Sequence, residues 1–428
     1  MEKLLITGER KLFGEVEISS SKNSTLPLLA ACLLTKGTVT FEQIPALNDI
    51  RTLLKLLENL GTKVEYLENN KIRVCAKDVN NFEATYDLVK TMRASVLVLG
   101  PLVARFGKGI VSLPGGCAIG VRPIDMHLAG LKEMGATVKL ESGHVEVTCE
   151  QLHGACIVLP FPSVGATENL MMAACFAKGL TIIKNAALEP EIIDLANFLR
   201  NLGAFIKGDG TSTITIEGLS THKEFSTDIT YTPIPDRIEA ATYMIAAAIT
   251  NSKISIKNVR VDHLDSVLNA LEQMGHHYLA DPNDSNTLHY QGYDEKEGFK
   301  GITIDTAPYP GLPTDIQAQL VALCTQANSP SIITEHIFEN RFMHIPELNR
   351  LGANIQLKGH SAFIPGNTPL TGAPVMCTDL RASAALVLAA LCAQGESHIR
   401  RIYHLQRGYY NLVGKLSNLK AMIALENE

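Results

Sequence analysis

The sequence predicts an α/β fold of two domains, each built from three pseudo-symmetric repeats with buried helices. Six helix-length runs of small and apolar residues recur in the 428 residues, and their starts lie 66 to 79 residues apart. Each run opens with polar or charged residues and ends in Gly or Ser before a β-branched strand. A repeat of about 70 residues exceeds a solenoid unit, so we expect closed domains rather than an open array. The runs are Lys22–Gly37, Arg93–Gly109, Gly165–Gly179, Asp236–Ser252, Asp315–Ser329 and Arg381–Gly395.

The six runs have almost no polar face, and a helix that is apolar all round must be buried. A buried helix still has unpaired N–H groups and the positive end of its dipole at its first turn. Where several such starts converge beside Lys and Arg, we expect a strong anion site. The polar residues at the helix starts are therefore the first candidates for function.

A second pattern has the same period. Amphipathic segments that lead into strands end at Leu60-Gly61, Met134-Gly135, Leu202-Gly203, Met274-Gly275 and Leu351-Gly352. The glycines suit the position after a helix, where a left-handed conformation costs glycine little. Each repeat is predicted to run strand, buried helix, strand, amphipathic helix and strand pair.

The sixth repeat is incomplete. After Leu419 only KAMIALENE remains, with Lys420 in the position of the glycine, and no closing strand follows. Lys3–Gly8 (KLLITG) resembles Ser212–Gly218 (STITIEG), which closes the third repeat. We infer that the N-terminal residues complete the C-terminal unit and that the chain crosses twice between domains. The predicted domains are residues 22–232, and residues 1–21 together with 233–428.

Composition narrows the class of protein. The 46% hydrophobic content supports large cores, and the net charge of −6 argues against nucleic acid or membrane surfaces as partners. The N-terminus lacks the apolar run of a signal peptide, and no stretch reaches the ~18 apolar residues of a membrane span. The nine cysteines show no CxxC and no metal-ligand spacing. We expect a reduced, cytoplasmic chain without a metal.

Cys117 differs from the other eight cysteines, because it lies in the loop PGGCAIGVRP at residues 114–123. Three glycines let the loop move and let its backbone approach a ligand. Arg122 is close enough in sequence to favour the thiolate. This segment alone is compatible with a reactive thiol on a lid and with an ordinary cysteine in a tight turn.

A resemblance to known proteins runs from residue 1 to about 420 and is carried by ten motifs in order along the chain: SSKNSTLP, DLVKTMRAS, PGGCAIGVRPIDMH, SVGATEN, EPEIIDLANFL, PDRIEAAT, LPTDIQAQ, FENRFMHIPEL, TDLRASAA and RIYHLQRGY. Together they resemble the enolpyruvyl transferase family, and within it the UDP-N-acetylglucosamine 1-carboxyvinyltransferases. The resemblance implies two inside-out α/β barrels of three repeats each, with N-terminal strands that complete the second domain.

The resemblance also implies the reaction. The enolpyruvyl group of phosphoenolpyruvate would pass to the 3-hydroxyl of UDP-N-acetylglucosamine with release of phosphate, the first committed step of peptidoglycan synthesis. Addition and then elimination proceed through a tetrahedral intermediate. Both substrates are anionic, so cationic side chains and helix starts are needed. They are the implied partners, and no cofactor is implied.

Three residues match catalytic positions of the family. Lys22 matches a lysine that contacts phosphoenolpyruvate. Asp315 matches the aspartate proposed as base toward the sugar hydroxyl. Cys117 matches the loop cysteine that can add phosphoenolpyruvate covalently, serves in proton transfer or product release, and is alkylated by the epoxide fosfomycin.

The other matches are expected to bind substrate. Arginines 93, 122 and 407 match residues around the phosphate and carboxylate of phosphoenolpyruvate. Asn23 matches a residue that holds the sugar, and two short stretches match those that hold the uridine diphosphate. The full predicted substrate-binding set is Lys22, Asn23, Arg93, Arg122, Pro123, Ile124, Asp125, Ser163, Val164, Gly165, Asp315, Ile337, Arg341, Asp379, Arg381 and Arg407.

Some of these residues have simpler structural interpretations. Asp236 and Asp315 both follow Pro-containing turns and suit helix N-caps. We interpret Asp236 as a cap within a structural cluster, and Asp315 as functional because its motif matches so closely. His127 is either a ligand contact or a helix-face histidine satisfied by a backbone group.

The sequence also departs from the family pattern. Phe161 stands where many members have a lysine that helps to bind the diphosphate, Leu188 where Arg is common, and Gln406 where Asp is common. None of the three replaces a predicted catalytic residue. The first two affect the predicted contacts with the nucleotide, and therefore the identity of the acceptor.

Three alternative functions stay open beside the main one. The first is an enolpyruvyl transferase with another nucleotide acceptor; the PGGC loop argues against the shikimate branch. The second is a non-catalytic UDP-sugar-binding relative, against which the joint presence of Lys22, Cys117, Asp315 and Arg407 argues. The third is a repeat scaffold, which buried helices with charged starts suit poorly.

Overall fold

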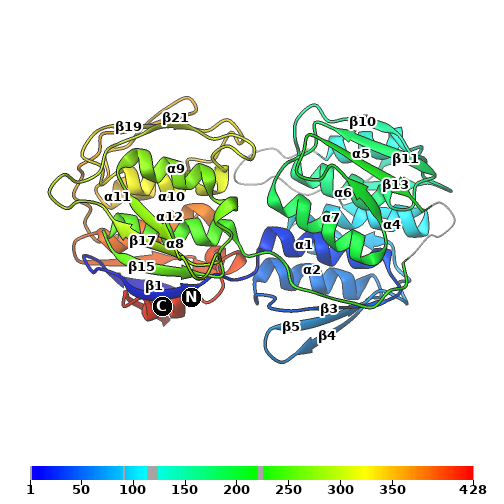
Figure 1. The fold of residues 1–428 in the computed structure, drawn as a ribbon, viewed down its shortest axis with the longest axis horizontal. Helices are drawn as coiled ribbons and strands as arrows, with labels where there is room; N and C mark the ends of the chain where they lie inside the picture. The colour runs from blue at the N-terminus through cyan, green and yellow to red at the C-terminus, as the bar shows by residue number, and fades with distance from the viewer. Residues whose placement is uncertain (1, 90–91, 113–123, 142, 220–224, 428) are drawn as a thin grey trace. The chain divides into compact units, whose positions relative to one another are not determined.

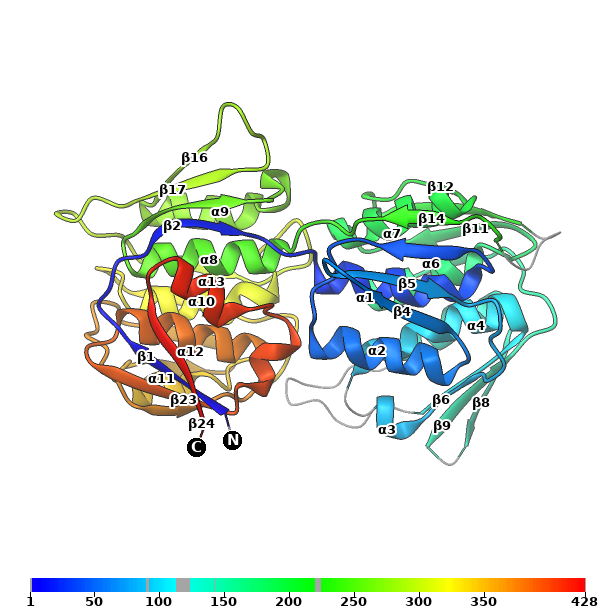
Figure 2. The same ribbon diagram turned by 90° about the horizontal axis from the view of Figure 1, so that it is seen from below.

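The structure is a computed structural model that describes residues 2–89, 92–112, 124–141, 143–219 and 225–427. The chain forms two compact units. The middle unit begins at Ser20 and ends at Ile234, and the terminal unit joins the residues up to Ser19 to those from Pro235 onward. Sheets lie outside and helices inside each unit (Figures 1 and 2). No helix in these described ranges has the length and apolarity needed to cross a membrane.

The described residues form six four-stranded sheets that share one topology, three in each unit. In the spatial order given below, the first two strands of every sheet are parallel. The third strand of each sheet pairs antiparallel with the second and with the fourth. The predicted α/β fold of repeated units is therefore confirmed.

The sheets of the middle unit follow the chain order of the first three repeats. Their strands, in spatial order, are β14 (Ile229–Tyr231), β3 (Thr38–Phe41), β5 (Lys71–Cys75) and β4 (Lys63–Leu67); β6 (Glu83–Ala84), β7 (Lys108–Ser112), β9 (His144–Thr148) and β8 (Thr137–Glu141); and β10 (Cys156–Val158), β11 (Gly179–Lys184), β13 (Thr213–Gly218) and β12 (Phe205–Lys207).

The sheets of the terminal unit repeat the same arrangement. Their strands are β2 (Phe13–Glu17), β15 (Lys253–Lys257), β17 (Leu288–Gly292) and β16 (His277–Ala280); β18 (Thr303–Asp305), β19 (Ser331–Thr334), β21 (Ser361–Ile364) and β20 (Gln356–Lys358); and β22 (Pro374–Met376), β23 (Glu396–Arg400), β1 (Glu2–Thr7) and β24 (Met422–Asn427).

The N-terminal strand completes the sixth repeat, as the sequence predicts. β1 lies between β23 and β24, with Leu4 opposite Ile399 on one side and Leu425 on the other (Figure 2). This is the place of β13 in the third repeat, whose sequence β1 resembles. The expectation that no closing strand follows Leu419 is confirmed, because the only strand described after it, residues 422–427, is the edge strand β24 in the place of β12.

Two further strands close their units. β14 pairs in parallel with β3, so the last strand of the middle unit joins the sheet of its first repeat. β2 pairs in the same way with β15 in the terminal unit. The sequence does not predict these pairings in detail, because a parallel edge strand has no turn that fixes its neighbour.

The six apolar runs form buried helices. The second begins as a 3₁₀ turn, because Pro101 lacks the N–H that an α-helix would direct to the carbonyl of Leu97. The helices are α1 (Lys22–Ala31) with η1 (Cys32–Leu34), η2 (Arg93–Val98) with α4 (Leu99–Phe106), α6 (Val164–Ala174), α8 (Arg237–Ile249), α10 (Thr314–Cys324) and α12 (Leu380–Cys392).

The amphipathic helices lie between the buried helices and solvent. The five predicted terminal glycines have φ between 92° and 116°, and Lys420 takes their place in the sixth repeat with φ 69°. These helices are α2 (Asn48–Asn59), α5 (Asp125–Glu133), α7 (Pro190–Leu202), α9 (Asp265–Met274), α11 (Ile345–Arg350) and α13 (Leu412–Asn418), with the short α3 (Tyr86–Val89), η3 (Val261–His263) and η4 (Ile402–Arg407).

Candidate functional site

In the terminal unit, α8, α10 and α12 pack against one another (Figure 1), and hydrogen bonds join residues near their starts. Arg381 of α12 reaches Asp315 of α10, and Gln319 of α10 reaches Thr242 of α8 at 3.3 Å. The positive ends of three helix dipoles therefore lie in one region of this unit, together with Arg381 and, as described next, Arg341.

Asp315 is not the cap of α10. The capping position is Pro313, and Asp315 is the second residue of the helix. Its Oδ1 accepts from Nη2 of Arg341 at 2.6 Å and its Oδ2 from Nη2 of Arg381 at 2.9 Å. The Asp315 side chain is 26% exposed, whereas those of the two arginines are 3% and 4% exposed. The structure thus presents one accessible carboxylate on two buried guanidinium groups.

Arg381 remains charged in this surrounding. Burial by itself would lower the pKa of Arg381, but Asp315, Tyr409 and Asp236 outweigh that effect and raise the pKa above its ordinary value. The backbone N–H of Arg381 donates to Oδ1 of Asp379 at 2.8 Å. Asp379 is therefore the N-cap of α12, which ties two predicted site residues to one helix start.

Tyr409 links the three helices. Its hydroxyl lies 3.0 Å from Oγ1 of Thr242 and accepts from Nε2 of Gln319 at 3.2 Å and from Nη1 of Arg381 at 3.3 Å. Sequence reasoning missed Tyr409, Gln319 and Thr242 as parts of the site. Tyr409 stands two residues after Arg407 in the motif RIYHLQRGY, and this position was the sequence feature that could have identified it.

Asp236 has the structural role that the sequence predicts. Its Oδ1 accepts from two backbone N–H groups in the first turn of α8, at 2.8 and 3.0 Å. Nearby, Glu239 accepts from the backbone of Ser19 and from Lys415, both at 2.7 Å. Burial raises the pKa of Glu239, and the Lys415 ammonium opposes that rise.

Three predicted residues of the terminal unit lie in segments after a strand. Arg341 lies between β19 and α11, and its guanidinium carbon is 5.5 Å from the ring centre of Phe338. Ile337 precedes it in the same segment. Arg407 is the last residue of η4 and is half-buried.

In the middle unit, Lys22 begins α1 and is buried. Its Nζ lies 3.3 Å from Oδ2 of Asp49, which is in the first turn of α2. Ser21 caps α1 by accepting from the backbone N–H of Ser24, and the half-buried Asn23 follows Lys22. A buried ammonium is thus held at a helix start beside a carboxylate.

The two stretches predicted to hold the uridine diphosphate lie at neighbouring helix starts of the middle unit. Ile124 and Asp125 begin α5, and Ser163 caps α6 through the N–H of Ala166 at 3.3 Å. Val164 and Gly165 begin α6. A Cβ placed on Gly165 would meet Cε1 of His127 at 3.4 Å, so α5 and α6 approach closely at these residues.

His127 is satisfied by a side chain rather than by the backbone group considered above. Its Nδ1 lies 3.0 Å from the amide nitrogen of Asn169. Burial lowers the pKa of His127 to about 4, so its imidazole is neutral at pH 7. His127 therefore adds no positive charge beside the first turn of α6.

Several predicted residues lie outside the described ones. Cys117, Arg122 and Pro123 are among them, as is the side chain of Arg93, whose backbone begins η2. Their assignments remain predictions.

The three residues that depart from the family pattern lie in different surroundings. Phe161 is 41% exposed, two residues before the cap of α6. Leu188 is half-buried before α7. Gln406 is exposed and donates to Glu2 at 3.3 Å, away from the network of Tyr409.

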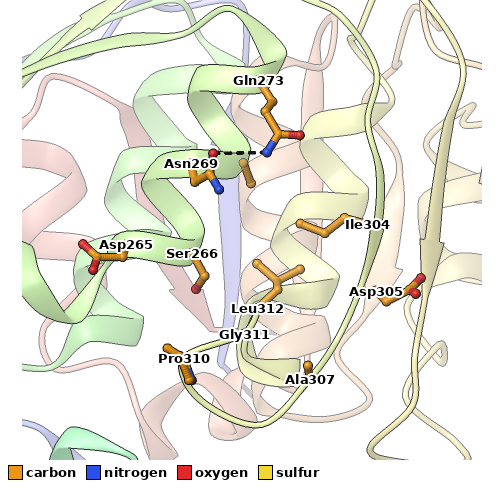
Figure 3. A pocket seen from close by; sticks show the side chains of 11 residues that line it. Asp265, Ser266, Asn269, Gln273, Ile304, Asp305, Ala307, Pro310, Gly311 and Leu312 are labelled. Carbon is orange, nitrogen blue, oxygen red and sulfur yellow. Dashed lines mark hydrogen bonds between the residues drawn. The ribbon is translucent and has the colours of Figure 1, made fainter.

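An open hollow of about 340 Å³ lies elsewhere in the terminal unit, between α9, β18 and the loop before α10 (Figure 3). None of the predicted site residues lines it. The lining residues are Asp265, Ser266, Asn269, Ala270, Gln273, Ile304, Asp305, Ala307, Pro310, Gly311 and Leu312.

Known proteins match the chain along its whole length. The family model of EPSP synthase (3-phosphoshikimate 1-carboxyvinyltransferase) matches residues 6–416. The UDP-N-acetylglucosamine 1-carboxyvinyltransferases of Geotalea uraniireducens and Trichlorobacter lovleyi are each 51% identical, and each alignment covers 100% of both chains.

Solved structures agree. The enolpyruvyl transferase NikO from Streptomyces tendae has a TM-score of 0.89 at 26% identity, over 100% of this chain and 99% of that one. An EPSP synthase from Acinetobacter baumannii, at 18% identity and full coverage of both chains, has a TM-score of 0.77 and shows the same fold. The chain therefore belongs to the enolpyruvyl transferase family, in the branch of the UDP-N-acetylglucosamine 1-carboxyvinyltransferases.

Proposed function

We propose that the chain is an enzyme that transfers the enolpyruvyl group of phosphoenolpyruvate to the 3-hydroxyl of UDP-N-acetylglucosamine and releases phosphate. The sugar oxygen forms a bond to C2 of phosphoenolpyruvate and gives up its proton, while C3 gains one. C3 then loses a proton, the bond from C2 to the phosphate oxygen breaks, and the double bond returns. This reaction begins peptidoglycan synthesis.

The carboxylate of Asp315 carries the mechanistic part of the proposal. A general base must be accessible and fixed in place, and Asp315 is accessible on two buried arginines. We assign it the proton of the sugar hydroxyl. The guanidinium groups of Arg341 and Arg381 hold the carboxylate in one orientation through two charge-assisted hydrogen bonds.

The cationic residues supply the second part. Lys22 is assigned to phosphoenolpyruvate, because a buried ammonium at a helix start suits an anionic group. Arg93, Arg122 and Arg407 are assigned to the same substrate, and Cys117 to proton transfer or product release. For the nucleotide we assign the starts of α5 and α6.

The remaining proposals concern organisation and location. The two units are taken as the domains predicted at residues 22–232 and at residues 1–21 with 233–428. A cytoplasmic location is proposed, because both substrates are cytoplasmic metabolites. The eight cysteines that the structure describes are all free, which suits a reducing compartment.

A phosphate-release assay tests the function. Purified protein is given phosphoenolpyruvate with UDP-N-acetylglucosamine, with shikimate 3-phosphate, with another UDP-sugar, or with no acceptor. Phosphate release that depends on UDP-N-acetylglucosamine, with the enolpyruvyl ether detected by mass spectrometry, is the expected result. Preference for another acceptor would overturn the substrate assignment, and binding without turnover would favour a non-catalytic relative.

A further inference from the structure

Glu335 is a buried carboxylate with four hydrogen-bond donors around it. It follows β19 directly and is 1% exposed. Its Oε1 accepts from Oγ1 of Thr306 at 3.0 Å and from the backbone N–H groups of Ile337 and Phe338 at 2.7 and 3.1 Å. Its Oε2 accepts from Oγ1 of Thr314 at 2.8 Å. A carboxylate with this many donors fixes every segment that it touches.

One of these segments is the start of α10. The buried helices α1, α6, α8 and α12 each begin with a Ser or Asp side-chain cap. By contrast, α10 begins after Pro313, which makes no side-chain cap bond. Its first residue, Thr314, is tied instead to Glu335 from the neighbouring strand. Asp315 is the next residue, so this bond fixes the backbone that carries the proposed base.

The second segment leads to Arg341. The turn at residues 335–338 closes on Glu335 through the N–H groups of Ile337 and Phe338. Arg341 follows within three residues and donates to Asp315 at 2.6 Å. The backbone on both sides of this ion pair is therefore tied to one carboxylate.

We propose that Glu335 is a positioning residue that sets the geometry of the Asp315–Arg341 pair. The inference rests on the proposed function, because it takes Asp315 as the base. Because Glu335 fixes the start of α10, the carboxylate of Asp315 is not needed to cap that helix and stays available to substrate. An error of about 1 Å at a reacting group can cost 10²-fold in rate, so this anchoring has a kinetic consequence.

Two substitutions of Glu335 test the role at a temperature where circular dichroism shows every variant folded. Glu335→Ala removes both acceptor oxygens and with them all four hydrogen bonds, and we expect a fall in kcat of roughly 10²-fold. Glu335→Gln keeps the oxygen at Oε1, and we expect it to recover most of that loss. An alanine variant within twofold of the unsubstituted kcat, or a glutamine variant as slow as alanine, would overturn the proposal.

Thr314→Val isolates the bond at the helix start and leaves the side-chain shape unchanged. We expect kcat to fall roughly threefold to tenfold, the scale of one hydrogen bond, with an unchanged KM for UDP-N-acetylglucosamine. Thr334→Val is the matched control: it removes a hydroxyl 3.0 Å from Ser361, one residue before Glu335 on β19. Equal rates for the two variants would count against positioning, and this comparison decides the matter if Glu335→Ala does not fold.

The Asp315→Asn background separates the two claims. If Glu335 acts through Asp315, Glu335→Ala should cost little more in enzyme that already lacks the base. A full additional loss in that background would place the effect of Glu335 elsewhere. If Asp315→Asn alone leaves kcat unchanged, the assignment of the base fails whatever the Glu335 variants do.

Discussion

Nη1 of Arg381 lies 3.3 Å from the phenolic oxygen of Tyr409, so a buried hydroxyl holds the guanidinium group that contacts Asp315. The guanidinium carbon also lies 5.6 Å from the centre of the Tyr409 ring. Both contacts restrict the guanidinium group of Arg381. Tyr409 therefore acts on the proposed base through a second residue.

Tyr409→Phe should lower kcat roughly threefold to tenfold, because Arg381 loses one of its partners while the ring stays in place. Thermal unfolding should change little. Tyr243→Phe is the control, since that buried hydroxyl has no hydrogen-bond partner among the described residues. Steady-state rates of both variants would be compared, and equal rates would deny Tyr409 a positioning role.

Asp315→Asn keeps the shape of the side chain but cannot accept a proton. We expect near-normal binding of UDP-N-acetylglucosamine and a loss of turnover of roughly 10²-fold or more, the scale of losing a general base. Calorimetry gives the binding and a coupled phosphate assay gives the rate. Turnover within a few-fold of the unsubstituted enzyme would move the base elsewhere, and a joint loss of binding would indicate that Asp315 positions the sugar.

Cys117→Ala should lose most turnover and all sensitivity to fosfomycin while the protein folds normally. The expectation comes from the family resemblance and the glycine-rich loop. Cys117→Asp is the companion variant, because a carboxyl group can transfer protons but is not alkylated in the same way. Activity and inhibition would be assayed side by side, and unchanged turnover in the alanine variant would remove Cys117 from the mechanism.

Acid should destabilise the terminal unit through His276. Its ring is buried, with Nδ1 2.5 Å from the hydroxyl of Tyr290, and burial lowers its pKa to about 3. The unfolded chain protonates this histidine below about pH 6.5 and so binds more protons than the folded chain. The contribution of neutral His276 is complete above pH 6.5 and is lost as the pH falls toward 3, with a limiting slope of about 1.4 kcal/mol per pH unit.

The double variant His276→Phe/Tyr290→Phe removes this titration without leaving an unpaired hydroxyl. Denaturant midpoints between pH 4 and 7 should depend less on pH in this variant than in the parent. His277→Gln, at the exposed neighbouring position, is the control. The same slope in all three proteins would show that His276 does not carry the dependence.

Arg105→Met should destabilise the middle unit by about 2–4 kcal/mol. Nη1 of the buried Arg105 donates to the carbonyls of Leu33, Thr35 and Ala76 at 2.8, 3.2 and 2.8 Å. Methionine keeps most of the volume but leaves these acceptors without their donor. Chemical denaturation measures the change.

Arg73→Met is the control for Arg105→Met. Arg73 pairs with Glu65 at 2.9 Å on the surface of the same unit, and such pairs contribute about 1 kcal/mol or less. Similar midpoints for the two variants would show that the buried arginine adds nothing beyond an exposed one.

The sequence predicts the repeats well, because an apolar helix flanked by glycine and strand signals has few alternatives. It also places β1, since the resemblance between KLLITG and STITIEG reflects equivalent positions in two sheets. It does not reveal the buried polar groups that join segments far apart in the chain. Arg105 and Glu335 each look like ordinary charged residues, and only the fold brings their partners to them.

For the site, the sequence identifies the residues better than their relationships. It selects Asp315, Arg341 and Arg381 by motif, but the two arginines reach Asp315 from 26 and 66 residues away. For Asp315 the choice between cap and base rests on the motif match, which favours the base, because both roles suit an Asp after proline. The position of Pro313 at the cap excludes the first role and is visible only in the structure.

The place of β1 has a consequence for synthesis on the ribosome. Lys3 and His398, on paired strands, are separated by 395 residues, so β1 has no partner until nearly the whole chain exists. At 5–20 residues per second, this strand waits roughly 20 to 80 seconds. The middle unit can finish folding during translation, whereas the terminal unit cannot close the sheet of β1 before β23 and β24 leave the exit tunnel. Emergence of β23 and β24 from the ribosome is thus the event that gives β1 its partners.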